Sequence, residues 1–150
     1  MAASLSACAR RFDYVREVGP NTGAWVSLFQ RFTGNLPGAS WCASFVCFIA
    51  DVAYLGASPL KPVVAKWLGA SCPALLAFAR TQNWVVATPQ VDDLFFYLNS
   101  AGVAHHVGIV TGVNPLVGVA GNTSADGRSP NGTGVFEHTI SASVFVRLPQ

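Results

Sequence analysis

The stretch from Cys42 to Leu55 constrains the fold more than any other part of the chain. It contains neither proline nor glycine, and Gly56 follows it directly. Apolar side chains recur in it at helical spacing: Phe45, Ile49, Val52 and Ala53. This spacing predicts a helix that buries one stripe of its surface. The rest of the chain must therefore supply elements that pack against this helix.

Cys42 lies at the start of the predicted helix. Pro37-Gly38 breaks the chain before it, and Ser40 can accept hydrogen bonds from the free amides of a helix start. Unpaired N–H groups and the positive end of the helix dipole lower the pKa of a cysteine thiol at such a position. The same N–H groups can bind the oxyanion of a tetrahedral intermediate. Cys42 is a candidate nucleophile, and the competing interpretation is a small buried hydrophobic residue.

The residue pattern changes near position 83. Helices are predicted before it at 2–16, 24–32, 42–55 and 74–80, and strands after it at 84–87, 94–98, 106–111, 117–120 and 144–148. A cap at Asn21 or Thr22, a helical turn at 63–68 and a long polar loop at 123–134 are also expected. The pattern predicts a single α+β domain over residues 1–150, with N-terminal helices packed on a C-terminal antiparallel β-sheet.

Two adjacent histidines open one of the predicted strands. Neighbouring strand residues point to opposite faces, so His106 shares a face with Gly108 and His105 does not. Gly108 leaves room for the helix of Cys42 to pack closely, which favours His106 as the partner of the thiol. Asn122 follows, and Cys, His and Asn in this order are the parts of a thiol acyl-transfer enzyme. The alternatives are a solvated strand entrance for the histidines and a turn residue for Asn122.

Composition argues against several classes of function. Hydrophobic residues make up 51% of the chain, but no apolar run reaches the roughly 18 residues of a membrane span. A net charge of +2 is too small to indicate a nucleic-acid partner. Cys8, Cys47 and Cys72 lack metal-ligand spacing, and no phosphate-binding loop is present. We therefore expect no metal and no other cofactor.

The N-terminal residues do not have the pattern of a signal peptide. Leu5-Ser6-Ala7-Cys8 has the form of a lipoprotein attachment box, but neither a basic start nor a long apolar region precedes it. We interpret the match as chance and expect synthesis in the cytoplasm.

Four short blocks together resemble the CHAP family, the cysteine, histidine-dependent amidohydrolase/peptidase domains of the papain-like NlpC group. The blocks are Trp41–Val46, Asp93–Phe96, His106–Val110 and Gly121–Ser124. They occur in the family's order, and the resemblance extends over about residues 14–148. The turn at 19–23 also resembles a subgroup common in phage and prophage genomes.

The resemblance implies a papain-like fold and hydrolysis of an amide bond in peptidoglycan, by an endopeptidase or an N-acetylmuramoyl-L-alanine amidase. It implies Cys42 as the nucleophile, His106 as the base that later returns the proton to the leaving amine, and Asn122 as the group that orients the imidazole. The chain departs from the family at two positions. Many members have glutamate where Ala120 stands and glycine where Asp92 stands. With the first departure, the third member is an amide or is absent.

Three further points stay open at the level of sequence. The second oxyanion donor is expected in the loop before Cys42, at Asn35 or Ser40. Asp93 is interpreted as a structural residue at the entry to its strand. His138 lies in a polar, hairpin-like region and is interpreted as inert.

Two other functions remain compatible with these residues. One is a non-hydrolytic module of the same fold that binds cell-wall fragments or is structural in a phage particle. The other is an acyltransferase or amidase that acts on an amide outside the wall. The expected partners are a peptidoglycan peptide and a phage or secretion assembly, with neither nucleic acid nor a membrane span. We expect the protein to be made in the bacterial cytoplasm and to act on the cell wall. For a phage endolysin, this cytoplasm is that of the host cell.

Overall fold

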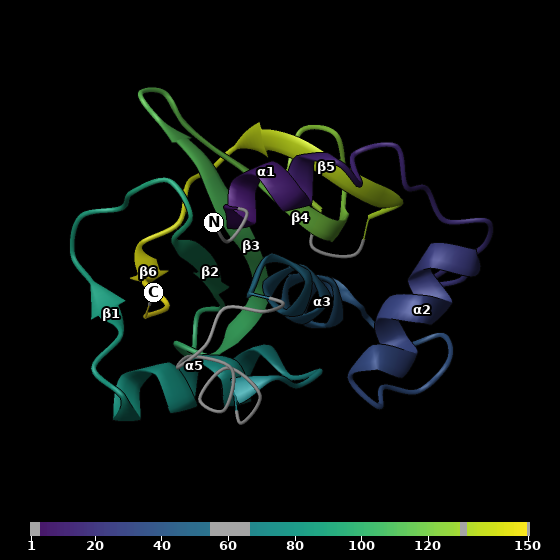
Figure 1. Ribbon diagram of the computed structural model, residues 1–150, viewed down its shortest axis with the longest axis horizontal. Helices are drawn as coiled ribbons and strands as arrows, with labels where there is room; N and C mark the ends of the chain where they lie inside the picture. Colours follow the sequence, from purple (N-terminus) through teal and green to yellow (C-terminus); the bar gives the residue numbers. More distant parts are fainter. Residues whose placement is uncertain (1–3, 55–66, 130–131, 150) are drawn as a thin grey trace.

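A computed structural model describes residues 4–54, 67–129 and 132–149. Its helices are α1 (Leu5–Arg10), α2 (Ala24–Phe32), α3 (Cys42–Tyr54) and α5 (Cys72–Thr81). Its strands are β1 (Val85–Val86), β2 (Leu94–Leu98), β3 (Ala104–Val113), β4 (Leu116–Thr123), β5 (Gly134–Thr139) and β6 (Val144–Val146). These strands form one antiparallel sheet in the order β1-β6-β2-β3-β4-β5 (Figure 1). The predicted α+β class, with the helices mostly N-terminal and the strands C-terminal, is confirmed.

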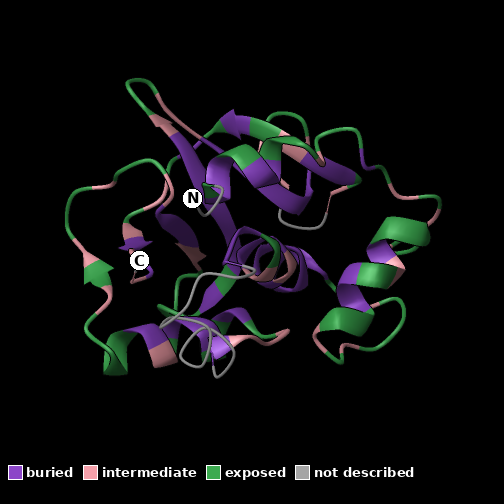
Figure 2. Ribbon diagram, in the orientation of Figure 1, coloured by how far each residue is buried: buried purple, intermediate pink, exposed green. Residues whose placement is uncertain are grey.

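Helix α3 lies across the face of the sheet and is the most deeply buried helix in Figure 2. The side chains of Phe45, Ile49 and Ala53 are buried as predicted, whereas Val52 is 40% exposed and lies outside the buried stripe. Helix α1 packs on α3 and on β3 and β4, while α2 packs on α3 (Figure 1). A helix that is apolar around most of its circumference requires this cover on several sides.

Apolar side chains cover both faces of the sheet. Alternate residues of the central strands contribute to the core under α3, among them Leu94, Phe96, Val107 and Ile109. The residues between them contribute to a second, smaller cluster: Phe95, Val110, Ala120, Ile140 and Phe145. Because successive strand residues point to opposite faces, β3 is buried along most of its length.

Several predicted boundaries differ from the structure. Helix α1 ends at Arg10 rather than 16, and α2 has the predicted bounds but begins after Gly23, which makes no side-chain cap bond. Helix α5 begins at Cys72 because the Ser71 hydroxyl accepts a hydrogen bond from the Ala74 amide at 3.3 Å. Residues 63–66 of the predicted helical turn lie outside the described part of the chain.

Strand β5 was missed in the region interpreted as a loop and a polar hairpin. Its pairing with β4 begins at Thr123, opposite Gly134, and continues to Thr139. Polar residues obscured it in the sequence: Glu137 and His138 lie within the strand. Thr111 and Arg10 donate hydrogen bonds to the Glu137 carboxylate, so its charge is compatible with a place in the sheet.

A buried ion pair connects the start of β2 to the C-terminal segment. The Asp93 carboxylate is almost fully buried and accepts two hydrogen bonds of 2.8 Å from the Arg147 guanidinium. It also accepts one of 2.7 Å from the Gln90 amide. These bonds account for Asp93 as a structural residue.

Asp92 occupies the position at which the CHAP resemblance expects glycine. Its φ of +77° lies in the left-handed region, which favours glycine and which aspartate tolerates better than most residues. Its carboxylate accepts a 2.7 Å hydrogen bond from the Ser6 amide in the first turn of α1. The departure therefore keeps the backbone conformation and adds a contact to the N-terminal helix.

Among the helices that the structure describes, none is long and apolar enough to cross a membrane.

Candidate active site

Cys42 is fixed at the first residue of α3 by the residue before it. The Trp41 carbonyl accepts the first helical hydrogen bond, from the Phe45 amide at 2.9 Å. The Trp41 side chain is fully buried, stacks on Phe29 with ring centroids 5.8 Å apart, and donates a 2.8 Å hydrogen bond from Nε1 to Glu17. Because Trp41 is held on two sides, the helix start and the thiol of Cys42 have a defined position.

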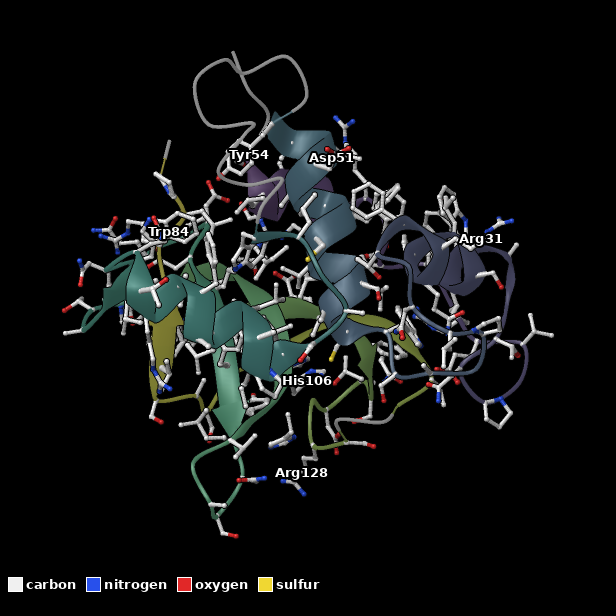
Figure 3. All side chains as sticks on the ribbon, turned by 90° about the horizontal axis from the view of Figure 1, so that it is seen from below. Arg31, Asp51, Tyr54, Trp84, His106 and Arg128 are labelled. Carbon is white, nitrogen blue, oxygen red and sulfur yellow. The ribbon has the colours of Figure 1, made fainter. Side chains whose placement is uncertain are left out.

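His106 lies next to this end of α3. Figure 3 shows it at the end of the helix opposite to Asp51 and Tyr54. Tyr97 pairs with His106 across the strands and Leu98 pairs with Ala104, which leaves His105 as the extra residue of a β-bulge. His106 is fully buried, whereas His105 is exposed. The Tyr97 ring stacks on the His106 imidazole with centroids 5.8 Å apart and an interplanar angle of 12°.

The reason given for His106 from the sequence was nevertheless wrong. A Cβ added at Gly108 would lie 2.3 Å from the Phe95 ring, so Gly108 makes room for that ring and not for α3. The close approach of α3 occurs on β4 instead. A Cβ at Gly121 would lie 2.6 Å from Trp41 and 2.8 Å from Phe45. The glycine that brings the helix start close to the sheet is therefore the one directly before Asn122.

Asn122 lies in a bulge of β4, the strand next to that of His106. It directly follows Gly121, which lies against Trp41 and Phe45 at the start of α3. The pairing of β4 with β5 shifts between Ala120 and Thr123, and Asn122 itself has a φ of +54°. Asparagine adopts this left-handed conformation more readily than most residues. The alternative interpretation as a turn residue is replaced by a bulge within a strand, where the side chain is fully buried.

The surroundings of Cys42 favour the thiolate. Hydrogen bonding from the Cys72 thiol is the largest influence and lowers the pKa of Cys42 well below its ordinary value. Burial acts in the opposite direction, while the nearby imidazole of His106 and the backbone of Val107 lower the pKa further. The two sulfur atoms of Cys42 and Cys72 are 3.5 Å apart. The site therefore combines a buried thiol with several groups that stabilise its anion.

His106 and Asn122 hold unused hydrogen-bonding capacity. Both ring nitrogens of His106 and both amide atoms of Asn122 are buried without a hydrogen bond of regular geometry to any described residue. An unsatisfied buried polar group costs about 1–3 kcal/mol, so such groups call for an explanation. Catalytic hydrogen bonds are often long or misaligned before the substrate binds. His106 influences the thiol in this way without a fully formed hydrogen bond.

A cavity of about 850 Å³ adjoins the site through Tyr97, whose ring stacks on His106 and also lines the cavity. Other lining side chains are His105, Arg128 and His138. Burial lowers the pKa of His138 below its ordinary value, which keeps the ring neutral. In that form Nδ1 donates a 2.9 Å hydrogen bond to the Thr139 carbonyl, and the lone pair of Nε2 stays unused.

The structure also shows what surrounds Asn35 and Ala120, two positions considered in the sequence analysis. Asn35 donates a 2.8 Å hydrogen bond from Nδ2 to the Ser40 carbonyl, so that amide braces the loop before Cys42. Ala120 is fully buried in the second apolar cluster. No group of three metal-binding side chains occurs in the part of the chain that the structure describes.

Two contributors to the site were missed in the sequence. Cys72 was set aside because it has no motif around it, yet its sulfur lies against that of Cys42. Tyr97 was treated as a strand residue only. Both are separated from Cys42 by at least thirty positions, and no local pattern reveals such contacts.

A scan against family models found no match, and searches of curated proteins and of solved structures found no similar protein either.

Proposed function

We propose that this chain is a cysteine amidohydrolase of the CHAP type that cleaves an amide bond in peptidoglycan. Cys42 is the nucleophile, His106 the general acid and base, and Asn122 the group that orients the imidazole. The observation that carries the proposal is the buried cluster at the start of α3. In it, a thiol with a lowered pKa lies beside His106, and the fully buried Asn122 directly follows Gly121, the glycine against which the start of α3 packs.

The proposed reaction begins when the Cys42 thiolate attacks the amide carbonyl carbon. The oxyanion that forms lies near the free N–H groups of the first turn of α3, which can donate to it. His106 gives its proton to the leaving nitrogen, and the C–N bond breaks to leave a thioester on Cys42. His106 then takes a proton from water, the hydroxide attacks the thioester, and the thiolate is released.

Asn122 differs from a carboxylate in what it contributes to this cycle. An amide accepts the imidazole N–H and fixes the ring, but it carries no charge to offset the imidazolium. The site relies on the anionic thiolate for that purpose. Ala120, which stands where many CHAP domains have glutamate, is enclosed by apolar side chains and adds no charge.

The direct test uses the full chain and purified cell-wall peptidoglycan. Cys42→Ala is expected to abolish the release of new amino groups, because it removes the sulfur on which the thioester forms. The matched control is Cys47→Ala, which removes a second buried thiol of the same helix. Mass spectrometry of the products distinguishes a new amine within the peptide from a free N-terminal alanine, and so an endopeptidase from an amidase. Hydrolysis by Cys42→Ala at the wild-type rate refutes the proposal.

Asn122→Gly is the sharpest variant for the third residue. Glycine keeps the positive φ of +54° and removes only the amide. We expect a lower kcat with little change in unfolding temperature. An unchanged kcat contradicts an orienting role for Asn122.

One observation favours the non-hydrolytic alternative. The Cys42 side chain is only 4% exposed, whereas attack on a polymer requires the sulfur to reach a carbonyl carbon. A module that only binds wall fragments would co-sediment with peptidoglycan equally well as wild type and as Cys42→Ala, and neither protein would release products. This outcome supports the alternative.

A further inference from the structure

The thiols of Cys42 and Cys72 face each other across the space between two helices. Their sulfur atoms are 3.5 Å apart, and both side chains are buried and free. Each cysteine is the first residue of its helix, Cys42 in α3 and Cys72 in α5. The contact therefore joins two helix starts that are 30 positions apart in the chain.

This pair is close to the geometry of a covalent bond. A disulfide needs the sulfurs at about 2.05 Å, so they must approach by roughly 1.5 Å from their present 3.5 Å. Side-chain rotation at two helix starts contributes to such an approach. The other cysteine of α3 is occupied differently, because the Cys47 sulfur contacts the Gly69 carbonyl and amide at 3.2 and 3.4 Å.

We propose that Cys42 and Cys72 form a dithiol modification site, which hydrogen peroxide oxidises to a disulfide and which thereby switches off the nucleophile reversibly. The switching of hydrolysis rests on the proposed function, whereas formation of the disulfide does not.

The first oxidation step consumes the peroxide. The Cys42 thiolate attacks one oxygen of hydrogen peroxide, the O–O bond breaks, and hydroxide leaves. The product is a sulfenic acid on Cys42, whose sulfur has given two electrons to the peroxide. The hydroxide takes up the proton that Cys42 released earlier and becomes water.

Cys72 then resolves the sulfenic acid. Its sulfur attacks the Cys42 sulfur, the S–S bond forms, and the S–O bond breaks. The Cys72 proton joins the departing hydroxide, so the whole reaction converts two thiols and one peroxide into one disulfide and two waters. While Cys42 is a thiolate, hydrogen bonding to it and burial raise the pKa of Cys72. The neutral sulfenic acid removes that anion, so Cys72 becomes available only after the first step.

Disulfide formation gives a role to Cys72, a thiol that hydrolysis does not use. Hydrolysis needs only the thiol of Cys42, yet the thiol of Cys72 lies within contact distance of it. The surroundings lower the pKa of Cys42 and raise that of Cys72, so Cys72 is the less acidic of the two. A low-pKa attacking thiol beside a resolving thiol is the arrangement of a redox-sensitive cysteine. Reduction by dithiothreitol reverses the bond, because two exchange steps return both thiols and oxidise the reagent.

The experiment uses the reduced full-length protein and hydrogen peroxide added in small molar excess. Free thiols are then blocked in denaturant, and peptides are mapped without reduction. We expect one intramolecular Cys42–Cys72 linkage with the loss of two hydrogens, complete loss of peptidoglycan hydrolysis, and full recovery with dithiothreitol. Cys47→Ala is the matched control and is expected to behave as wild type.

Cys72→Ala provides the second comparison. Without the resolving thiol, Cys42 is expected to proceed to the sulfinic acid, and dithiothreitol no longer restores hydrolysis. The proposal is overturned if oxidised wild type lacks the Cys42–Cys72 linkage, or if the linkage forms only between molecules. Linkage without any hydrolysis by the reduced protein refutes the proposed function alone. Hydrolysis without linkage refutes the redox site alone.

Discussion

Substitution of Gly121 by alanine tests how α3 is held against the sheet. The added Cβ would lie 2.6 Å from Trp41 Cζ3 and 2.8 Å from Phe45 Cβ. Carbon atoms in contact are normally about 3.5–4.0 Å apart, so the overlap is roughly 1 Å on two buried side chains. Neither side chain has free space, since both are fully buried. Overpacking of this kind costs about 1–3 kcal/mol of unfolding free energy.

Gly69→Ala is the matched control. A Cβ at Gly69 meets nothing within 4 Å, and neither glycine has a positive φ. Both substitutions reduce the entropy of the unfolded chain by the same amount, worth about 0.4–1 kcal/mol, so this gain cancels in the comparison. We therefore expect Gly121→Ala to unfold below Gly69→Ala by roughly 2–12 °C, at about 2–4 °C per kcal/mol for a chain of this size.

Thermal unfolding followed by circular dichroism measures this difference. Trp41 directly precedes Cys42, so relief of the overlap also moves the thiol away from His106. Any hydrolytic activity should fall in Gly121→Ala at temperatures at which the protein is still folded. Equal unfolding temperatures for the two variants would show that α3 does not pack on β4 as described.

Substitutions at three further positions test other contacts. Arg147→Ala leaves the buried carboxylate of Asp93 without its two 2.8 Å bonds. We expect a loss of unfolding free energy toward the lower end of about 3–5 kcal/mol, since the Arg147 side chain is 39% exposed. In urea unfolding, the unfolding free energy of Arg147→Lys should lie between those of the wild type and Arg147→Ala. A loss in Arg147→Ala smaller than that of an ordinary surface ion pair contradicts the structural role of the bond between Arg147 and Asp93. Asn122→Ala should be about 1–2 kcal/mol less stable than Asn122→Gly, because alanine disfavours a φ of +54°; equal stability would argue against the bulge. Burial of the His138 ring lowers its pKa, while its bond to the Thr139 carbonyl raises it, so the folded state resists protonation. The stability from the neutral ring is complete above the ordinary histidine pKa and is lost as pH falls below it; His138→Gln should reduce the drop in unfolding free energy between about pH 7.5 and about pH 5, and an unchanged drop would contradict the assignment.

The order of elements could be predicted because it depends on local properties. The proline- and glycine-free stretch predicted α3, and a run of five consecutive apolar residues predicted β2 with its observed bounds. The loop predicted at 123–134 includes the first residue of β5. The rest of β5 was not predicted, because the polar residues Glu137 and His138 obscure the alternation of that strand. Hydrogen bonds from Arg10 and Thr111, which are distant in the sequence, make the Glu137 carboxylate compatible with a sheet.

The structure keeps His106 beside Cys42 but contradicts the reason for favouring it over His105. In a regular strand, two neighbouring histidines point to opposite faces. The bulge at His105 changes that alternation, and the glycine that admits the helix is Gly121 rather than Gly108. Bulges and close approaches depend on the partner strand and on packing, which a local pattern does not contain.

The sequence by itself determined the fold class, the place of Cys42 at a helix start and the presence of a histidine in a later strand, and it left Asn122 in a strand or a turn. Periodicity and helix-breaking residues are enough for these features, since they act over a few positions. Only the tertiary structure decided which groups meet the thiol. It brought Cys72 to within 3.5 Å of Cys42, stacked Tyr97 on His106, and placed Asn122 in a bulge directly after the glycine that packs on the helix start. These contacts join residues far apart in the chain, and they exist because two helix starts and two bulged strands pack into the same buried volume.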